Sequence, residues 1–274
     1  MVSTSTVALN NGVQMPQIGF GVFQIPPGRK TCDSVRTALQ LGYRAVDTAT
    51  AYGNEESVGR AIKDSGIDPE EVFVTTKLWI PDHGYDNTLR AFEESRKKLG
   101  LDKLDLYLIH WPAKADFSDT WRALERLYKD GRIRAIGVSN FLSHHLETLL
   151  ETAEVTPAVN QIEFHPFNVQ PELLEFCGSH KIQVEAWSPL VRGQFFDHPL
   201  IAEIAEQHGH SPAQILIRWD LQHEVVTIPR STREAHIREN CEVFDFELSA
   251  EDMTRLDALD EGRRIGPDPD TFVG

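Results

Sequence analysis

The feature of this sequence that most limits its fold is a repeated alternation of short apolar segments with longer segments of helical periodicity. Eight apolar segments recur at intervals of roughly 25–30 residues, and their composition is typical of strands buried on both faces of a parallel sheet. Eight strand-then-helix units favour a closed (β/α)8 barrel over an open doubly wound sheet. An open dinucleotide-binding sheet would carry G-x-G-x-x-G after its first strand, and Gly19–Gln24 has only the first two glycines. The predicted strands are Gln17–Phe20, Arg44–Asp47, Val72–Lys77, Leu104–His110, Ile133–Ser139, Ala158–Ile162, Gln183–Trp187 and Val225–Ile228.

Capping residues mark where the intervening helices begin. Asn54 precedes an acidic first turn and is expected to cap a helix that ends near Gly66. Ser211 is expected to cap a later helix that has Pro212 at its first position. Ser249 opens a last helix that lies outside the eightfold repeat.

The two ends of the chain add to the predicted barrel. The segment before Gln17 is expected to form a short hairpin across the barrel floor. The segment after Gly262 is rich in glycine and proline, and we predict a mobile loop over the pocket. Because no Pro/Ser-rich linker divides the chain, we expect a single α/β domain over residues 1–274. It would be a (β/α)8 TIM barrel with an extra C-terminal helix and a tail loop.

The charge balance bears on the class of partner. The 274 residues contain 27 Lys and Arg against 42 Asp and Glu, which gives a formal net charge of −15. An acidic surface repels nucleic acids and anionic membranes, so we expect neither as a partner. No apolar run reaches the roughly 18–20 residues of a membrane span, and no secretory signal is visible. Cys32, Cys177 and Cys241 are scattered, so we expect a reduced, cytoplasmic setting.

Reactive side chains occur at the carboxyl ends of three consecutive predicted strands. The second strand ends in Asp47 and is followed by Tyr52, the third ends in Lys77, and the fourth ends in His110. In a (β/α)8 barrel these strand ends share one rim, so the four side chains are expected to converge. Since isolated buried charges are costly, a paired cluster explains the pattern better than four separate structural residues.

Such a cluster can support acid-assisted addition of hydride to a carbonyl. A Tyr phenol has a pKa near 10 and is a poor acid at neutral pH unless its phenolate is stabilised. A Lys ammonium about 4 Å away contributes on the order of 4 kcal/mol, so we expect Lys77 to lower the pKa of Tyr52 by roughly two to three units before burial opposes it. Asp47 would keep Lys77 charged, and neutral His110 would orient a substrate carbonyl. Tyr52 would then act as general acid beside a hydride-donating cofactor.

Eight short motifs occur in order along nearly the whole chain: GYRAVDTATAYGNEESVG, VFVTTKLW, DLYLIHWP, IRAIGVSNF, AVNQIEFHP, EAWSPL, TIPRST and ENCEVFDFELS. Together they resemble the aldo-keto reductase superfamily, and within it the bacterial 2,5-diketo-D-gluconate reductases. The resemblance implies a monomeric barrel that uses NADPH to reduce small aldehydes, ketones or dicarbonyls, 2,5-diketo-D-gluconate among them. It places a catalytic tetrad on Asp47, Tyr52, Lys77 and His110, which agrees with the roles argued above.

By the same resemblance, the cofactor lies extended across the barrel mouth. Hydrogen bonds to its carboxamide would come from Ser139, Asn140 and Gln161, and Trp187 would stack on the nicotinamide ring. The SPLGRG of the family reads SPLVRG here, so Val191 stands where a glycine would permit any φ angle. The residues implied for this part of the site are Gly21, Val22, Phe23, Ser139, Asn140, Gln161, Trp187, Ser188, Pro189 and Leu190.

The resemblance places the adenosine 2′-phosphate on the basic stretch Arg230–Arg233, after the eighth strand. Guanidinium groups and hydroxyls suit phosphate recognition. The family usually has Lys where Arg230 stands and Arg where His236 stands, and histidine is mostly neutral at pH 7. We therefore expect a preference for NADPH with some use of NADH. The residues implied at this end are Arg230, Ser231, Thr232, His236, Glu239 and Asn240.

Substrate contacts are expected from an aromatic wall beside His110, formed by Phe23, Trp79 and Trp111. No metal site is expected, because the usual metal-binding spacings are absent. The adjacent His144 and His145 would point apart on a helix.

Two other interpretations stay open at this point. Lys77 could be a Schiff-base nucleophile in a barrel aldolase, although this needs an uncharged amine and the neighbouring Asp47 opposes that. The chain could also be a catalytically silent barrel that serves as a cofactor sensor or scaffold. The intact tetrad argues against a catalytically silent barrel.

Overall fold

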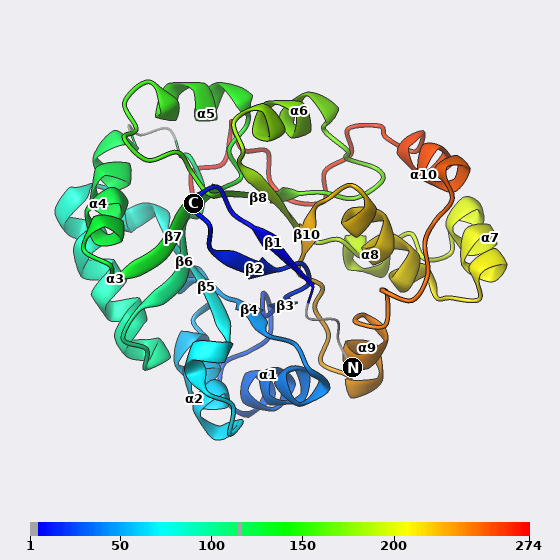
Figure 1. Cartoon of the computed structure of the whole chain (residues 1–274), viewed down its shortest axis with the longest axis horizontal. Helices are drawn as coiled ribbons and strands as arrows, with labels where there is room; N and C mark the ends of the chain where they lie inside the picture. Colours follow the sequence, from blue (N-terminus) through cyan, green and yellow to red (C-terminus); the bar gives the residue numbers. More distant parts are fainter. Residues whose placement is uncertain (1–4, 114–116) are drawn as a thin grey trace.

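The computed structural model describes residues 5–113 and 117–274, and its centre is a sheet of eight parallel strands (Figure 1). The strands pair in the order β10-β9-β8-β7-β6-β5-β4-β3, so neighbours in the sheet also follow one another along the chain. Parallel neighbours need crossover connections, and the helices that provide them form an outer ring (Figure 1). The strands are β3 (Phe20–Gly21), β4 (Ala45–Asp47), β5 (Phe73–Leu78), β6 (Leu104–Ile109), β7 (Ile133–Ser139), β8 (Val159–Glu163), β9 (Gln183–Trp187) and β10 (Val226–Thr227).

The sheet closes on itself at the seam between its first and last strands. Ile18, just before β3, pairs in parallel with Thr227 of β10. The Gly19 N–H donates to the Thr227 carbonyl at 2.9 Å, and the Thr227 N–H donates to the Gln17 carbonyl at 3.0 Å. Closure removes the free edges of the sheet. The predicted (β/α)8 barrel is confirmed.

The helices turn apolar faces toward the strands. On α4, Trp121, Leu124 and Leu127 lie on one side and are buried. Burying such side chains contributes about 1.5–3 kcal/mol each. No helix in residues 5–113 or 117–274 is long and apolar enough to cross a bilayer. The α-helices are α1 (Arg29–Leu41), α2 (Glu55–Asp64), α3 (Tyr85–Leu99), α4 (Ser118–Lys129), α5 (Ser143–Leu150), α6 (Pro171–Ser179), α7 (Pro199–His208), α8 (Pro212–Gln222), α9 (Glu234–Glu239) and α10 (Ala250–Asp257).

A hairpin covers the floor of the barrel, as predicted. It consists of β1 (Thr6–Ala8) and β2 (Gln14–Pro16), which pair antiparallel and cross the barrel axis in Figure 1. Leu9 and Met15 of this hairpin are buried in a cluster with Phe73 and other residues of the strands. The floor is therefore sealed by apolar packing, and any ligand must enter from the other end.

Two of the three predicted helix caps are confirmed. The side chains of Ser211 and Ser249 accept backbone N–H groups at the starts of α8 and α10. Asn54 occupies the N-cap position of α2 as predicted, but its side chain makes no capping bond. Its buried amide donates instead to the carbonyls of Val22 and Ile25, at 3.0 Å each. Asn54 thereby fixes the loop after β3 against the end of β4, next to the candidate site.

Candidate active site

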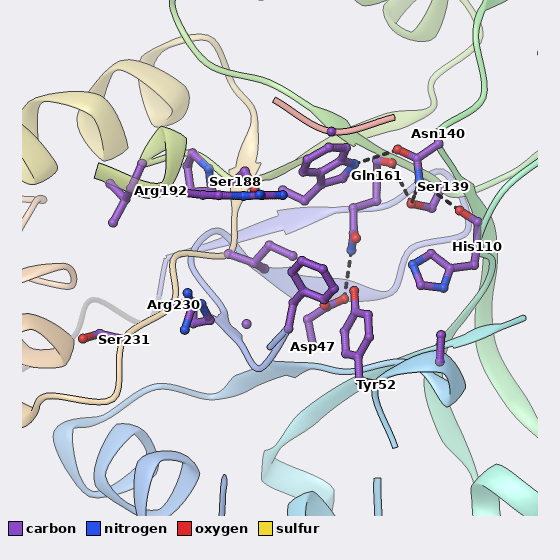
Figure 2. Close-up of a pocket in the computed structure, with 18 of the residues that line it drawn as sticks. Asp47, Tyr52, His110, Ser139, Asn140, Gln161, Ser188, Arg192, Arg230 and Ser231 are labelled. Atoms are coloured by element: carbon purple, nitrogen blue, oxygen red, sulfur yellow. Dashed lines mark hydrogen bonds between the residues drawn. The ribbon is translucent and has the colours of Figure 1, made fainter. Parts of the chain in front are cut away.

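A cavity of about 710 Å³ opens at the carboxyl ends of the strands. Figure 2 shows Tyr52, His110 and Gln161 facing one part of it, with Arg192, Arg230 and Ser231 at the opposite end. The cavity is therefore elongated, with the predicted tetrad at one end and basic groups at the other.

Asp47, Lys77 and Tyr52 form a continuous polar chain at the floor of this cavity. The Lys77 Nζ atom, on β5, donates to both Asp47 carboxylate oxygens at 2.6 and 2.7 Å and to the Thr48 carbonyl at 2.9 Å. The same Nζ lies 3.4 Å from the Tyr52 hydroxyl. Tyr52 sits in η1 (Thr50–Tyr52), the short 3-10 turn that follows β4. This turn brings the phenol back over the end of the neighbouring strand, so the three side chains converge.

The Lys77 amine is held in its charged form. Burial lowers its pKa, but the Asp47 carboxylate, and then Tyr52, outweigh burial and raise the pKa above its usual value. A charged ammonium cannot attack a carbonyl, so the geometry disfavours a Schiff-base role for Lys77.

The expected lowering of the Tyr52 pKa is wrong. Burial raises the pKa of Tyr52 to about 12, although Lys77 acts to lower it, and Asp47 adds to the increase. Desolvation and a nearby carboxylate together outweigh the ammonium in this cavity. The phenol therefore keeps its proton at neutral pH, and Lys77 offsets only part of the cost of forming a buried phenolate.

His110, just after β6, lies across the cavity floor from Tyr52, with the two ring centroids 5.6 Å apart. Burial, and then the charge of Lys77, hold the pKa of His110 well below its usual value, so the imidazole is neutral. Its Nδ1 atom is buried and has no hydrogen-bond partner in the described parts of the chain. Because Nδ1 is buried, Nε2 is the ring nitrogen that remains to contact a ligand.

The residues expected around a nicotinamide carboxamide lie on the next strands, and all of them line the cavity. The Asn140 amide donates to the His110 carbonyl at 2.9 Å and accepts the Trp187 indole N–H at 2.8 Å. The Ser139 hydroxyl donates to the Gln161 carbonyl at 2.9 Å. These bonds hold the Trp187 ring in one orientation along the cavity wall.

The buried carboxylate of Glu185, which was not among the predicted site residues, lies behind Gln161. The Gln161 Nε2 atom donates to Asp47 at 2.9 Å and to Glu185, on β9, at 2.7 Å. With its amide nitrogen engaged, Gln161 leaves its amide oxygen for other partners. Burial, and then the charge of Asp47, raise the pKa of Glu185 to about 8. The signal in the sequence was an acidic residue inside an otherwise buried predicted strand.

The loop after β9 has an unusual backbone. Ser188, Val191 and Arg192 are non-glycine residues with φ angles of 54°, 48° and 54°. The Val191 position, where glycine is expected, therefore does adopt the left-handed conformation, which costs roughly 1–2 kcal/mol for a residue with a Cβ. Ser188, Pro189 and Leu190 line the cavity as expected, and so does Arg192, which was not predicted.

The basic end of the cavity is lined by Arg230, Ser231, Thr232 and His236, together with Arg233. Glu239 and Asn240 line a smaller adjoining cavity of about 220 Å³. At the start of the barrel, Gly21 and Phe23 line the larger cavity. Val22 lines neither cavity, because its side chain is buried in the core and its N–H donates to the Asp47 carbonyl at 3.1 Å.

The predicted aromatic wall lies at the tetrad end. Trp79 and Trp111 flank His110, with ring centroids 5.2 and 6.4 Å from it, and Phe23 lies 5.0 Å from Tyr52. The wall has a further member, Phe272 of the C-terminal tail, whose ring is 4.3 Å from Trp111. The tail therefore contributes to the pocket beside the tetrad.

The tail lies over the cavity, as predicted. A mobile loop was expected, but hydrogen bonds attach the tail to the end of β8. The fully buried Glu163 carboxylate, at the end of β8, accepts the N–H groups of Ile265 at 2.5 Å and Gly266 at 3.1 Å. His165 lies 3.0 Å from the same carboxylate. A Cβ on Gly266 would overlap the indole ring of Trp187. Neither Glu163 nor Gly266 was predicted, because their contact joins segments far apart in the sequence.

His144 and His145 do not point apart, contrary to expectation. They lie in the first turn of α5, and their ring centroids are 4.0 Å apart. Both approach Asp270 of the tail, at 2.9 and 3.4 Å. His145 accepts the Leu142 N–H through Nδ1, so its Nε2 carries a proton and donates to Asp270 rather than offering a lone pair to a metal. The three residues are therefore a second attachment point for the tail.

Comparisons with known proteins agree with this geometry. Residues 17–261 match the model of the aldo/keto reductase family. A glyoxal reductase of Bacillus subtilis is 57% identical over 98% of this chain and 97% of its own length, and the methylglyoxal reductase DkgA of Escherichia coli is 44% identical over the full length of both.

Solved structures show the same fold. A mutant of Gox0644 in complex with NADPH superposes with a TM-score of 0.94 at 45% identity, covering 98% of this chain and 99% of that one. An aldo-keto reductase of Bombyx mori in complex with NADP gives a TM-score of 0.92 at 34% identity, covering 98% and 97%. From the matched sequence, the shared barrel and the converging side chains, we conclude that this chain is an oxidoreductase that belongs to the aldo/keto reductase family.

Proposed function

We propose that this chain, acting as one domain over residues 1–274 and as a monomer, uses NADPH to reduce small aldehydes, ketones and dicarbonyls to alcohols. The observation that carries the proposal is the buried Lys77–Asp47 pair, with Nζ 3.4 Å from the Tyr52 hydroxyl at the floor of a long cavity. The names of the relatives, glyoxal and methylglyoxal reductases, favour small dicarbonyls. A 2,5-diketo-D-gluconate substrate belongs to the same chemical class.

The cavity residues fit a nicotinamide dinucleotide. A flat indole, that of Trp187, lies along the wall at the tetrad end, where the Gln161 amide oxygen has no partner among the described residues. Arginines and hydroxyls lie at the other end, where phosphates would be held. When bound, the reduced nicotinamide supplies a hydride to the carbonyl carbon.

Tyr52 would supply the proton that completes the reduction. An alkoxide is a far stronger base than a phenolate, so proton transfer from Tyr52 is downhill even with its pKa at about 12. The Lys77 ammonium then stabilises the phenolate that is left, and Asp47 holds that ammonium in place. All these groups are ordered before the substrate arrives, which avoids reorganisation during the reaction.

His110 would orient the substrate. Its neutral ring can direct the N–H of Nε2 toward the carbonyl oxygen beside the Tyr52 hydroxyl. Two donors on one oxygen fix the carbonyl plane. The wall of Phe23, Trp79 and Trp111 then encloses the rest of a small substrate and excludes water.

An assay of NADPH oxidation with a panel of carbonyls tests the proposal. We expect turnover of glyoxal and methylglyoxal with NADPH, and slower turnover with NADH, because NADH lacks the 2′-phosphate that the basic end of the cavity would hold. Tight binding of NADPH without turnover of any carbonyl would contradict the proposal and favour a silent scaffold.

A further inference from the structure

We propose that Glu185 is a positioning residue, which fixes the Gln161 amide so that its oxygen accepts an N–H of the nicotinamide carboxamide. This inference rests on the proposed function and deepens it, since it names the residue behind one cofactor contact. Glu185 lies on β9 and pairs in register with Gln161 on β8, so both side chains point to the same face of the sheet. Both residues are buried, and of the two only Gln161 lines the cavity.

Two carboxyl groups take up both hydrogens of the Gln161 amide nitrogen. Its Nε2 atom donates to Asp47 at 2.9 Å and to Glu185 at 2.7 Å. With Asp47 alone, the amide could turn about its last torsion, which is broad and roughly two-fold in side chains of this type. The second bond, to Glu185, fixes the plane of the amide. Glu185 can accept this bond whether or not it is ionised, because a neutral carboxyl group keeps a carbonyl oxygen.

The Gln161 amide oxygen is thereby left for a ligand. It has no hydrogen-bond partner within residues 5–113 and 117–274, and Gln161 lines the cavity together with Trp187. An amide oxygen can only accept, so it selects a ligand atom that carries a hydrogen. The nicotinamide end of a dinucleotide offers such atoms in the N–H groups of its carboxamide. A turned amide would present its own N–H groups to the cavity and would lose this selection.

The bonds that fix Gln161 also connect it to the proton donor. Strands β8 and β4 are four places apart in the eight-stranded barrel, so the bond from Gln161 to Asp47 crosses the barrel interior (Figure 2). Asp47 in turn accepts two bonds from Lys77, whose Nζ lies 3.4 Å from the Tyr52 hydroxyl. Glu185 therefore holds the acceptor for the cofactor in a fixed place relative to the group that supplies the proton, as hydride transfer to a carbonyl requires.

Calorimetric titration of the full chain with two dinucleotides tests this inference without any turnover. The probes are NADP⁺ and its 3-acetylpyridine analogue, in which a methyl ketone replaces the carboxamide, so the carbonyl is kept and the N–H donors are lost. We expect the wild type to bind the analogue about three- to ten-fold more weakly, as for loss of one hydrogen bond. In Glu185→Met, which is similar in size but a poor acceptor, this ratio should approach one because NADP⁺ binding weakens. Glu185→Gln keeps an acceptor oxygen and should show the ratio of the wild type.

Asp220→Asn is the matched control, because it changes another fully buried carboxyl group, which binds Thr227 and lies outside the cavity. It should leave the ratio unchanged. If Glu185→Met does not fold, Glu185→Asp replaces it, since its carboxyl group is one methylene too short to reach Gln161.

A purely structural role for Glu185 would weaken both probes equally. An unchanged ratio in Glu185→Met, or in the Glu185→Asp variant that replaces it, would therefore overturn the inference, even if the wild-type enzyme reduces carbonyls. A wild-type ratio of one would overturn it as well. Conversely, a wild-type chain that reduces no carbonyl, but whose ratio depends on Glu185, would refute the proposed function alone.

Discussion

At the scale of single residues, the charge of Lys77 depends on Asp47, and the protonation of every other group at the cavity floor depends on this pair. The sequence could predict the four members of the tetrad, because reactive side chains at the ends of apolar strands are visible without coordinates. It could not predict the direction of the Tyr52 pKa, since that depends on how far desolvation outweighs an ammonium 3.4 Å away. It also could not predict a role for Glu185, because that role comes from a contact with Gln161, which lies on a different strand.

The buried Glu185 predicts a pH dependence. Its pKa of about 8 is raised above the usual 4.5, so the folded protein binds this proton more tightly than the unfolded chain does. The stability that it contributes is fully present below pH 4.5 and is lost as the pH rises through 8. Glu185→Gln keeps an acceptor for Gln161 and cannot ionise. The unfolding free energy of Glu185→Gln should therefore rise relative to that of the wild type between pH 4.5 and about pH 8, by up to about 1.4 kcal/mol per pH unit. Its melting temperature should rise relative to that of the wild type over the same range.

Ionised Glu185 also raises the pKa of Tyr52, so carbonyl reduction by the wild type should decline above pH 8 more than that by Glu185→Gln. The exposed Glu206→Gln serves as control and should follow the wild type in both measurements. Parallel pH profiles for wild type and Glu185→Gln would show that Glu185 is already ionised at neutral pH.

At the scale of elements, the C-terminal tail links the substrate pocket to the wall where the cofactor is expected. Phe272 contacts Trp111, Gly266 lies against Trp187, and the Glu163 carboxylate holds the tail backbone in place. The sequence could predict that the tail covers the pocket, because a segment rich in glycine and proline follows the last helix. It could not predict the attachment points, since nothing in a single sequence pairs Glu163 with a backbone segment at the other end of the chain.

The close contact of Gly266 with Trp187 gives a prediction at this scale. In Gly266→Ala the added methyl group would overlap the indole, so either the tail or the ring must shift. We expect a loss of about 1–3 kcal/mol in unfolding free energy and several-fold weaker NADPH binding, measured by denaturant titration and by quenching of Trp fluorescence.

Gly178→Ala on α6 is the matched control, because a Cβ there would meet no atom within 4 Å. It should leave NADPH binding unchanged. Equal NADPH affinities for Gly266→Ala and Gly178→Ala would show that the tail does not position Trp187.

At the scale of the whole molecule, the barrel brings together residues that are distant in sequence. The eightfold alternation was enough to predict the closed barrel, because each apolar strand and its helix repeat the same unit. The seam at Ile18 and Thr227 was harder to delimit, since the pairing there is an isolated bridge beside β3 and β10, which have two residues each. Strand ends from β4 to β10 meet at one rim, so proton donor, cofactor wall and phosphate end share one cavity.

The central claim is that Tyr52 donates the proton and has no large part in binding the cofactor. Tyr52→Phe removes only the hydroxyl beside Lys77 and keeps the ring against Phe23. The most direct test measures methylglyoxal turnover and the NADPH dissociation constant of this variant. Tyr128→Phe, on helix α4 and outside the cavity, is the control. We predict that turnover falls by 10² or more, as for loss of a general acid, while the dissociation constant changes less than about three-fold. Turnover within a few-fold of the wild type would contradict the account, because another group would then be the proton donor.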